Sequence, residues 1–230
     1  MTNEHLKYGG ELLIVCLTNL FNAMYQTEYV PTGMKSGLIY TLYKGSKKYE
    51  DDRKNYRGIS LLPVVTKLFE RLILNRMKTW LSLNNICFPS ANQNAYQETL
   101  CSMLTSFELQ ECISYNVERE SNVFVCFLDS SSAFDTVWHD GLFLKLNQLG
   151  IKGKTWRLLM KSYHGMKSNV VLNGKLSADI HVNKSVRQGS ILGPWFYMLF
   201  VHDLAQSLLK SKMAPALAKS LVGQCYKQTI

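Results

Sequence analysis

Asp129 is the residue of this sequence best placed to do chemistry, because it follows an unbroken apolar run at residues 123–128. Such a run is typical of a strand buried on both faces, so we expect it to be a central strand. A carboxylate at its end would be held on a rigid element and still reach solvent, where it could bind divalent ions beside phosphate. An aspartate after a strand is also commonly a turn former or a helix cap. Alone, Asp129 leaves both interpretations open.

Gln188 and Gly189 form a second candidate, directly before an apolar segment that predicts a helix at residues 191–209 with Pro194 near its first turn. Glycine allows a backbone to approach another group closely, and an exposed helix N-terminus tolerates phosphate nearby. The pair means nothing by itself. The position of the pair downstream of Asp129, followed by Leu-Gly-Pro, makes the pair a strong indication of a functional site.

The elements that must position these residues are a mixture of helices and strands, which predicts an α+β fold. A β-branched and aromatic run predicts a strand at residues 38–43, and Asn173-Gly174 after an apolar run predicts a hairpin. Helical spacing of apolar residues predicts further helices at residues 11–26, 65–81, 99–115, 142–149 and 154–164.

Charge is distributed unevenly along the 230 residues, whose net charge is +9. The balance is +7 at residues 35–78, −7 at residues 79–143 and +11 at residues 144–230. An acidic stretch between two basic ones suits a metal site flanked by surfaces that bind polyanions. Solvated helix faces would give the same runs, so charge does not choose between these interpretations.

Composition excludes several classes of protein. A hydrophobic content of 47% excludes a disordered chain, and no apolar run is long enough to cross a bilayer, so we expect no membrane association. The N-terminus lacks the pattern of a secretory signal. The six cysteines show no spacing typical of zinc ligands and predict small buried side chains in a reducing, intracellular compartment, nuclear or cytoplasmic. Nothing indicates an obligate protein partner.

Several ordered motifs resemble the reverse transcriptase domain of non-LTR (LINE-like) retrotransposons. The segment Phe-Leu-Asp-Ser-Ser-Ser-Ala-Phe-Asp-Thr-Val-Trp-His at residues 127–139 resembles the first palm motif of that family. Residues 186–196, Val-Arg-Gln-Gly-Ser-Ile-Leu-Gly-Pro-Trp-Phe, resemble the second palm motif. Residues 42–44 and 55–62 resemble the fingers. The resemblance implies RNA-directed DNA polymerase chemistry, with an RNA template, a DNA primer and deoxynucleoside triphosphates as substrates.

The resemblance also assigns roles to single residues. Asp129 and the backbone carbonyl of Ser130 would bind catalytic Mg²⁺, and Phe134 would be an aromatic steric gate that excludes a ribose 2′-hydroxyl. Lys44 and Arg57 would reach the triphosphate, where a guanidinium grips phosphate in bidentate fashion. Gln188 and Gly189 would lie beside the nascent base pair. Without the palm motifs, Phe134 would be interpreted as core packing and the two cations as surface charge.

The resemblance divides the chain into fingers and a partial palm. The expected units are fingers with leading helices at 1–120, the first catalytic motif with its strand at 121–143, intervening helices and a hairpin at 144–184, the second palm motif at 185–209, and a divergent tail at 210–230.

The third palm motif of the family, an aromatic-Ala-Asp-Asp hairpin, has no counterpart, because no Asp or Glu follows Asp203. We also expect the thumb to be absent. Two magnesium ions need several anionic ligands, so we expect this chain not to polymerise DNA. The alternatives are a non-catalytic nucleic-acid-binding remnant and a decayed product without a stable fold. A maturase-like or telomerase-like polymerase also resembles parts of the sequence, although residues 133–139 favour the non-LTR type.

Overall fold

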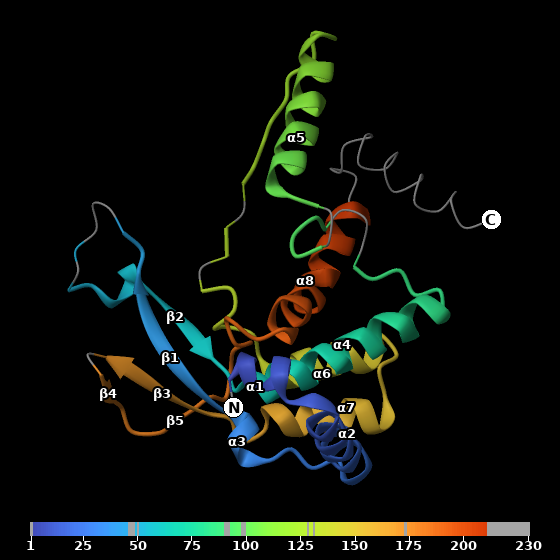
Figure 1. Ribbon diagram of the computed structural model, residues 1–230. Helices are drawn as coiled ribbons and strands as arrows, with labels where there is room; N and C mark the ends of the chain where they lie inside the picture. The colour runs from blue at the N-terminus through green and yellow to red at the C-terminus, as the bar shows by residue number, and fades with distance from the viewer. Residues whose placement is uncertain are drawn as a thin grey trace.

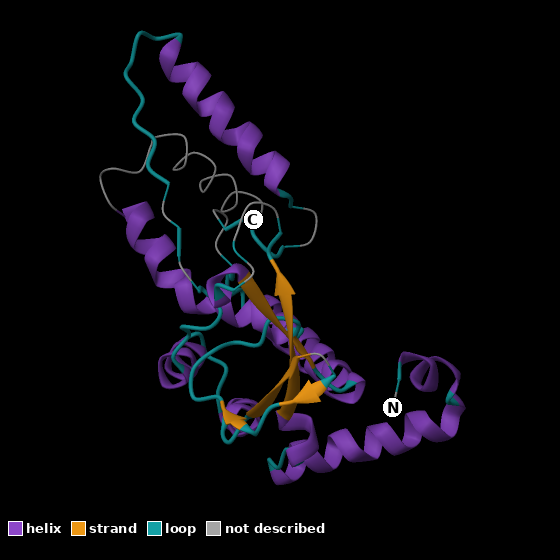
Figure 2. Ribbon diagram, turned by 90° about the vertical axis from the view of Figure 1, so that its left-hand side faces the viewer, coloured by secondary structure: helices purple, strands orange, loops and turns teal. Residues whose placement is uncertain are grey.

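The computed structural model describes residues 2–45, 49, 51–89, 93–97, 100–127, 129–130, 132–172 and 174–210. These residues form a layer of helices beside a small twisted sheet, with one helix projecting away from both (Figures 1 and 2). The fold agrees with the predicted α+β class. The helices are α1 (Asn3–Tyr8), α2 (Gly10–Thr27), α3 (Thr32–Lys35), α4 (Val64–Leu83), α5 (Ser102–Val117), α6 (His139–Gln148), α7 (Gly153–Tyr163) and α8 (Leu192–Lys210), with a 3₁₀ turn at Arg53–Asn55.

The sheet contains parallel and antiparallel strand pairs. Its strands are β1 (Ser36–Tyr43), β2 (Tyr56–Leu61), β3 (Lys167–Leu172), β4 (Lys175–Leu176) and β5 (Ile180–His181). Their order is β2-β1-β3-β4, and β5 also pairs with β3. The β1–β3 pair is parallel and the other pairs are antiparallel. The predicted hairpin is confirmed by the pairing of Leu172 with Lys175 on either side of its turn.

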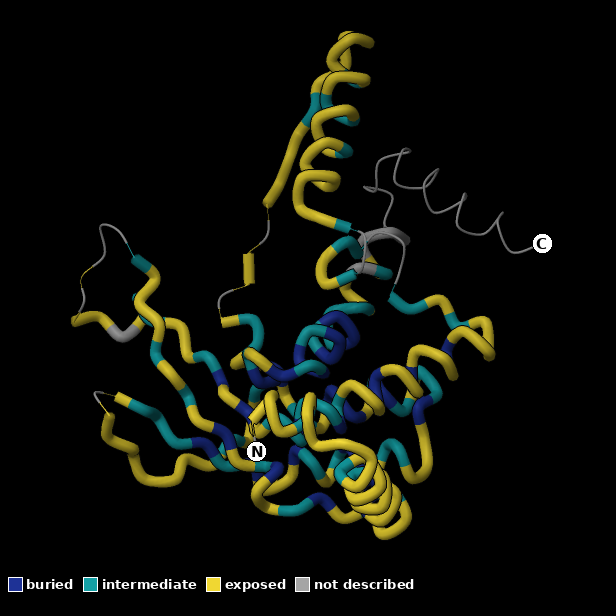
Figure 3. The backbone as a smooth tube through the Cα atoms, in the orientation of Figure 1, coloured by how far each residue is buried: buried dark blue, intermediate teal, exposed yellow. Residues whose placement is uncertain are grey.

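The core lies between the helices, as the buried part of the chain shows in Figure 3. Helix α4 illustrates why the apolar spacing produced it, because Phe69, Ile73, Met77 and Leu81 recur every four residues and are all buried. Helix α8 packs on α6 and α4 and contributes Phe196, which is fully buried. Each helix predicted from apolar spacing is present to within a few residues. None of the described helices is long and apolar enough to span a bilayer.

The predicted central strand at residues 123–128 is wrong. Residues 121–127 have no regular secondary structure, Phe124 is 94% exposed and Phe127 is 82% exposed, while residue 128 lies outside the described part. The segment runs beside α5, which itself buries no residue (Figure 3). An apolar run becomes a buried strand only where other strands pair with it. No strand among the described residues pairs with this segment.

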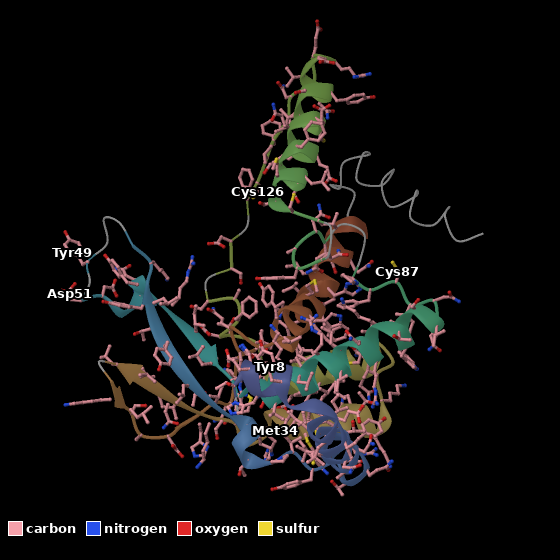
Figure 4. The ribbon with its side chains drawn as sticks, viewed as in Figure 1. Tyr8, Met34, Tyr49, Asp51, Cys87 and Cys126 are labelled. Carbon is pink, nitrogen blue, oxygen red and sulfur yellow. The ribbon has the colours of Figure 1, made fainter. Side chains whose placement is uncertain are left out.

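The cysteines also differ from the prediction. Cys16, Cys87, Cys101 and Cys126 are exposed free thiols and Cys112 is half-buried, whereas Cys225 lies outside the described residues. Cys126 is on the extended segment beside α5. Cys87 follows α4 and lies well apart from Cys126 (Figure 4). Apolar sequence neighbours do not bury a cysteine when the segment itself is uncovered, which explains the error at Cys126.

Residues 121–127 are expected to be the first site of limited proteolysis by chymotrypsin. Phe124 and Phe127 are side chains that this protease prefers. Cleavage also requires an exposed backbone that is free of the hydrogen bonds of a helix or sheet. We expect cleavage there at least about tenfold faster than after Phe69 or Phe196 in the core. Mass spectrometry of early fragments measures this. Equal early cleavage within α4 or α8 would contradict the described fold.

Candidate nucleotide-binding site

Residues from four separate segments line one pocket of about 350 Å³. They are Arg57, Tyr96, Phe134, Gln188, Gly189 and Pro194. Arg57, Phe134, Gln188 and Gly189 are four of the five residues for which the sequence predicts nucleotide contacts. The structure therefore brings together the side chains of two predicted motifs and of the fingers-like segment.

Arg57 reaches the pocket from strand β2. It pairs in register with Leu42 of β1, so its position follows from the antiparallel β1–β2 ladder, and its side chain is exposed. β2 is the edge strand of the sheet and has only β1 as a neighbour within the described sheet order. A cation on this edge can be reached by an anionic ligand without breaking the core.

Gly189 approaches β2 so closely that a side chain would not fit. Its φ is +107°, and an added Cβ would lie 2.5 Å from the carbonyl oxygen of Ser60. The amide of Ser60 donates to the carbonyl of Gln188 over 2.7 Å. Position 189 therefore requires glycine, because the backbone of β2 at Ser60 leaves no room for a Cβ. The hydrogen bond between Ser60 and Gln188 fixes Gln188 against β2, the strand that carries Arg57.

The turn that carries Phe134 is fixed against the segment that precedes α8. The carbonyl of Phe134 accepts from the amide of Val186 over 2.9 Å, and the amide of Ser185 donates to the carbonyl of Val137 over 2.9 Å. Within the turn, the amide of Asp135 donates to the carbonyl of Ser132, which has φ +54°. Backbone hydrogen bonds therefore hold the two predicted palm motifs together.

Two neighbouring rings contact Phe134, and sequence reasoning found neither of them. Tyr197 of α8 stacks on Phe134 with ring centroids 5.0 Å apart and an interplanar angle of 18°. Tyr96 meets it edge to face at 6.0 Å and 86°. Tyr197 lies three residues after Pro194 on α8, and nothing in that spacing indicates a contact with Phe134. Tyr96 comes from a loop, and no sequence signal marked it.

Asp129 and Ser130 do not line this pocket. Both are exposed and lie in a segment without regular secondary structure. In the part of the chain that the structure describes, no group of three or more His, Cys, Asp or Glu residues is arranged to hold a metal ion. A single exposed carboxylate does not match the several oxygen ligands that Mg²⁺ needs. The described residues therefore do not fit a magnesium site.

Lys44 is the predicted cation that the structure does not bring to the pocket. Its Nζ donates to the carbonyl of Lys54 over 2.6 Å, and its amide donates to the carbonyl of Asn55 over 2.8 Å. Both contacts lie where the β1–β2 hairpin meets its connecting loop, two positions along the chain from Leu42, the register partner of Arg57. Lys44 thus closes the base of the connecting loop, and Arg57 is the cation that lines the pocket.

The N-terminus of α8 is already occupied by protein groups, contrary to the expectation of an exposed helix end. A carboxylate oxygen of Glu70 accepts from the amides of Ile191 (2.7 Å) and Leu192 (3.4 Å), and the hydroxyl of Ser190 accepts from the amide of Gly193. A carboxylate at this position stabilises both the free amides and the helix dipole. The amides at this helix end therefore already have acceptors within the protein.

Glu70 is half-buried beside the buried side chains of Arg187 and Tyr163. Burial raises the pKa of its carboxyl, opposed by the two amide hydrogen bonds and by the charge of Arg187. Burial also lowers the pKa of Arg187, whose guanidinium donates to the carbonyl of Lys35. Burial raises the pKa of Tyr163 well above its usual range, and Glu70 adds to this. This cluster of three side chains anchors α8, and with it Tyr197, to α4 and α7.

Glu70→Gln is expected to flatten the dependence of stability on pH. Because the folded-state pKa of Glu70 lies above its ordinary value of 4.5, the folded chain binds this proton more tightly than the unfolded chain. That stabilisation is fully present below pH 4.5 and is lost as pH rises through the raised pKa. We therefore expect the free energy of unfolding in urea to fall more with pH above 4.5 in the wild type than in the variant.

Glu28→Gln provides a control, because the pKa of Glu28 is shifted in the opposite direction from that of Glu70. The hydrogen bond from Arg157 lowers the pKa of Glu28, so its contribution is present above the ordinary pKa and is lost on acidification. The Glu28→Gln profile should therefore differ from the wild type in shape only at acidic pH. Parallel wild-type and Glu70→Gln profiles above pH 4.5 would show that Glu70 is not buried as described.

Comparisons with known proteins identify the family of this chain. The family described as reverse transcriptase (RNA-dependent DNA polymerase) matches residues 44–226. Over 89% of this chain, it is 33% identical to a probable RNA-directed DNA polymerase from transposon X-element of Drosophila melanogaster. Identity is 30% over 89% of this chain to an RNA-directed DNA polymerase from mobile element jockey of Drosophila funebris.

Both relatives are much longer than this sequence. The chain spans 22% of the length of each, so the matched part is one region of a larger polypeptide in those proteins. The family match covers most of the chain and includes every residue of the pocket. The chain therefore belongs to the reverse transcriptase (RNA-dependent DNA polymerase) family and is a reverse transcriptase domain of the non-LTR retrotransposon type.

Proposed function

We propose that this chain binds the incoming deoxynucleotide for RNA-directed DNA synthesis, in which nucleotides are joined to a DNA primer on an RNA template. The observation that carries the proposal is that Arg57, Phe134, Gln188 and Gly189 line one pocket, although they come from three distant segments. A volume of about 350 Å³ is within the range of small-molecule sites. A cation, an aromatic ring and a glycine-containing backbone are the groups that a triphosphate, a sugar and a base pair require.

In this proposal, each of the four predicted residues in the pocket has one role in binding the nucleotide. Arg57 grips the triphosphate, because a guanidinium presents paired donors that match phosphate oxygens. The ring of Phe134 lies beneath the sugar and excludes a 2′-hydroxyl. Gln188 and Gly189, held against β2, form the floor beside the nascent base pair. In this proposal residues 1–120 are fingers, residues 121–143 and 185–209 are parts of the palm, and residues 144–184 connect them.

A second function, nucleic-acid binding without turnover, is favoured for these 230 residues by the surroundings of Asp129. Asp129 and Ser130 are exposed, and the described residues offer no cluster of carboxylates for Mg²⁺. We therefore propose that the chain by itself binds template, primer and nucleotide but does not extend the primer. The strongly basic segments supply the affinity for phosphate, which falls as salt rises.

A ternary complex tests the first function. The chain is mixed with an RNA template and a DNA primer that ends in a dideoxynucleotide, and its retention on a filter is measured with added deoxynucleotides and Mg²⁺. We expect the deoxynucleotide complementary to the next template base to stabilise the complex, and a mismatched one to leave it unchanged. Equal effects of all four deoxynucleotides, or no effect up to about 1 mM, would reject nucleotide selection at this pocket.

A primer with a free 3′-hydroxyl tests the second function in the same mixture. We expect no extension, while template and primer are still retained at low salt. Extension that is abolished by Asp129→Asn would overturn the non-catalytic proposal and show that Asp129 binds metal. Absence of retention even at low salt would reject nucleic-acid binding altogether.

A further inference from the structure

The ring of Phe134 packs at the border of the core, where it meets the rings of two tyrosines. Tyr197 lies nearly parallel to it at 5.0 Å, and Tyr96 meets it edge on at 6.0 Å. Hydrogen bonds fix the backbone of Phe134 but not its side-chain torsions. The direction of the ring therefore depends on what it packs against.

Tyr197 is the rigid one of the two neighbours. It lies on α8 between the buried Phe196 and Met198, and Glu70 caps the first turn of the same helix. Tyr96 is 56% exposed and belongs to a loop, so its ring is held by fewer contacts. The stacked geometry and the firm helix make Tyr197 the platform on which the ring of Phe134 rests.

We propose that Tyr197 is a positioning residue that sets the height of the Phe134 ring beneath the sugar and thereby the selection of deoxyribose over ribose. The inference rests on the proposed function of the pocket. A ring excludes a 2′-hydroxyl only when it is held in contact with the sugar, since a displaced ring leaves space for an oxygen. Without the stacked partner, Phe134 gains other rotamers and can turn away from a ribose.

The effect should appear in selectivity and not in overall affinity. Tyr197 does not line the pocket, so its removal leaves the contacts of Arg57 with phosphate unchanged. A deoxynucleotide has no 2′-oxygen and is indifferent to a modest movement of the ring. Loss of the stack should therefore tighten the binding of ribonucleotides and leave that of deoxynucleotides nearly constant.

The experiment measures dATP and ATP binding by the full chain in the ternary complex with a dideoxy-terminated primer and uridine as the next template base. The readout is the ratio of the ATP to the dATP dissociation constant. We expect Tyr197→Ala to lower this ratio about three- to tenfold, as suits the loss of one aromatic pair, with the dATP constant changed by less than about twofold. Tyr197→Phe keeps the ring and should retain the wild-type ratio.

Three further variants separate positioning from a general effect on the fold. Phe200→Ala removes another half-buried ring of α8, which packs on Lys145 and not on Phe134, and should leave the ratio unchanged. Tyr197→Leu removes the flat ring but leaves a smaller void than Tyr197→Ala, and it should lower the ratio even if Tyr197→Ala is unstable. Phe134→Ala should lower it most, and adding Tyr197→Ala should lower it no further, because Tyr197 acts through Phe134.

The outcomes distinguish the inference from the proposed function. If the wild type selects dATP and folded Tyr197→Leu selects it equally well, the positioning role is overturned and the pocket assignment stands. If Tyr197→Ala and Phe134→Ala lower the ratio additively, Tyr197 does not act through the ring, and the inference is overturned. If the wild type binds neither nucleotide, the proposed function fails and the inference fails with it.

Discussion

Arg57→Ala is expected to weaken binding of the complementary deoxynucleotide in the ternary complex by about 10- to 100-fold. Arg57 is the cation that lines the pocket, and its guanidinium can donate two parallel hydrogen bonds to phosphate oxygens. Hydrogen bonds to charged groups are worth about 1.5–3 kcal/mol, which corresponds to the expected range of affinity. Titration of the complex with the nucleotide measures the change directly.

Variants of other cations make this prediction specific. Arg57→Lys keeps the positive charge but loses the paired N–H donors of the guanidinium, so its affinity for the nucleotide should lie between those of the wild type and Arg57→Ala. Lys44→Ala should change affinity by less than about threefold, because Lys44 is hydrogen-bonded to the carbonyl of Lys54 and does not line the pocket. Arg119→Ala, in the turn that follows the projecting helix α5, should have no effect. Equal losses in all these variants would show general attraction between charges and not a defined phosphate contact.

Gly189→Ala is expected to lower the free energy of unfolding by about 2–5 kcal/mol. A left-handed backbone costs a residue with a side chain about 1–2 kcal/mol, and overpacking costs about 1–3 kcal/mol more. Both apply here, since φ is +107° and the new Cβ would meet the carbonyl oxygen of Ser60 at 2.5 Å. A backbone atom cannot turn aside as a flexible side chain can. Urea unfolding followed by circular dichroism gives the value.

Gly165→Ala is the matched control. Its φ of +71° is also left-handed, but nothing lies within 4 Å of the added Cβ. It should therefore cost only the conformational part, about 1–2 kcal/mol. The difference between the two variants measures the close approach of Gly189 to β2. Equal costs would contradict that approach, and a smaller cost at position 189 would indicate that the segment is not held against β2.

Local patterns in the sequence were sufficient to predict elements that do not depend on distant partners. The helical spacing of Phe69, Ile73 and Leu81 predicted α4, because a helix satisfies its own backbone hydrogen bonds. The Asn-Gly turn predicted the β3–β4 hairpin for the same reason, since its strands are neighbours in sequence. Charge, in contrast, left open whether the basic segments bind polyanions.

Elements that depend on partners could not be predicted in this way. Phe124 and Phe127 suggested a buried strand by their composition, yet burial requires a neighbouring strand, and the described residues provide none. Cys126 was misjudged with them. The sequence gives no local indication that β1 pairs in parallel with β3, because such pairing is determined by how the intervening helices pack.

In the candidate site too, residues in local motifs could be predicted, whereas residues that act through distant contacts could not. Arg57, Phe134 and Gln188 were predicted by motifs, and the structure places them around one pocket. The supporting residues were missed, because Tyr197 and Glu70 act only through contacts made in the folded state. A glutamate inside an amphipathic helix is usually exposed, and nothing in the sequence indicates that this one caps another helix.

The parallel pairing of β1 with β3 also sets the order in which the chain can fold. Residues 36–40 pair with residues 167–171, about 130 positions later, so this closure carries a large loss of chain entropy. During synthesis the β1–β2 hairpin can form early, but one edge of β1 remains open until β3 leaves the ribosome. That open edge is available to other nascent strands in the interval. Chaperone contact with β1 before residue 167 is made would therefore improve the yield of folded protein.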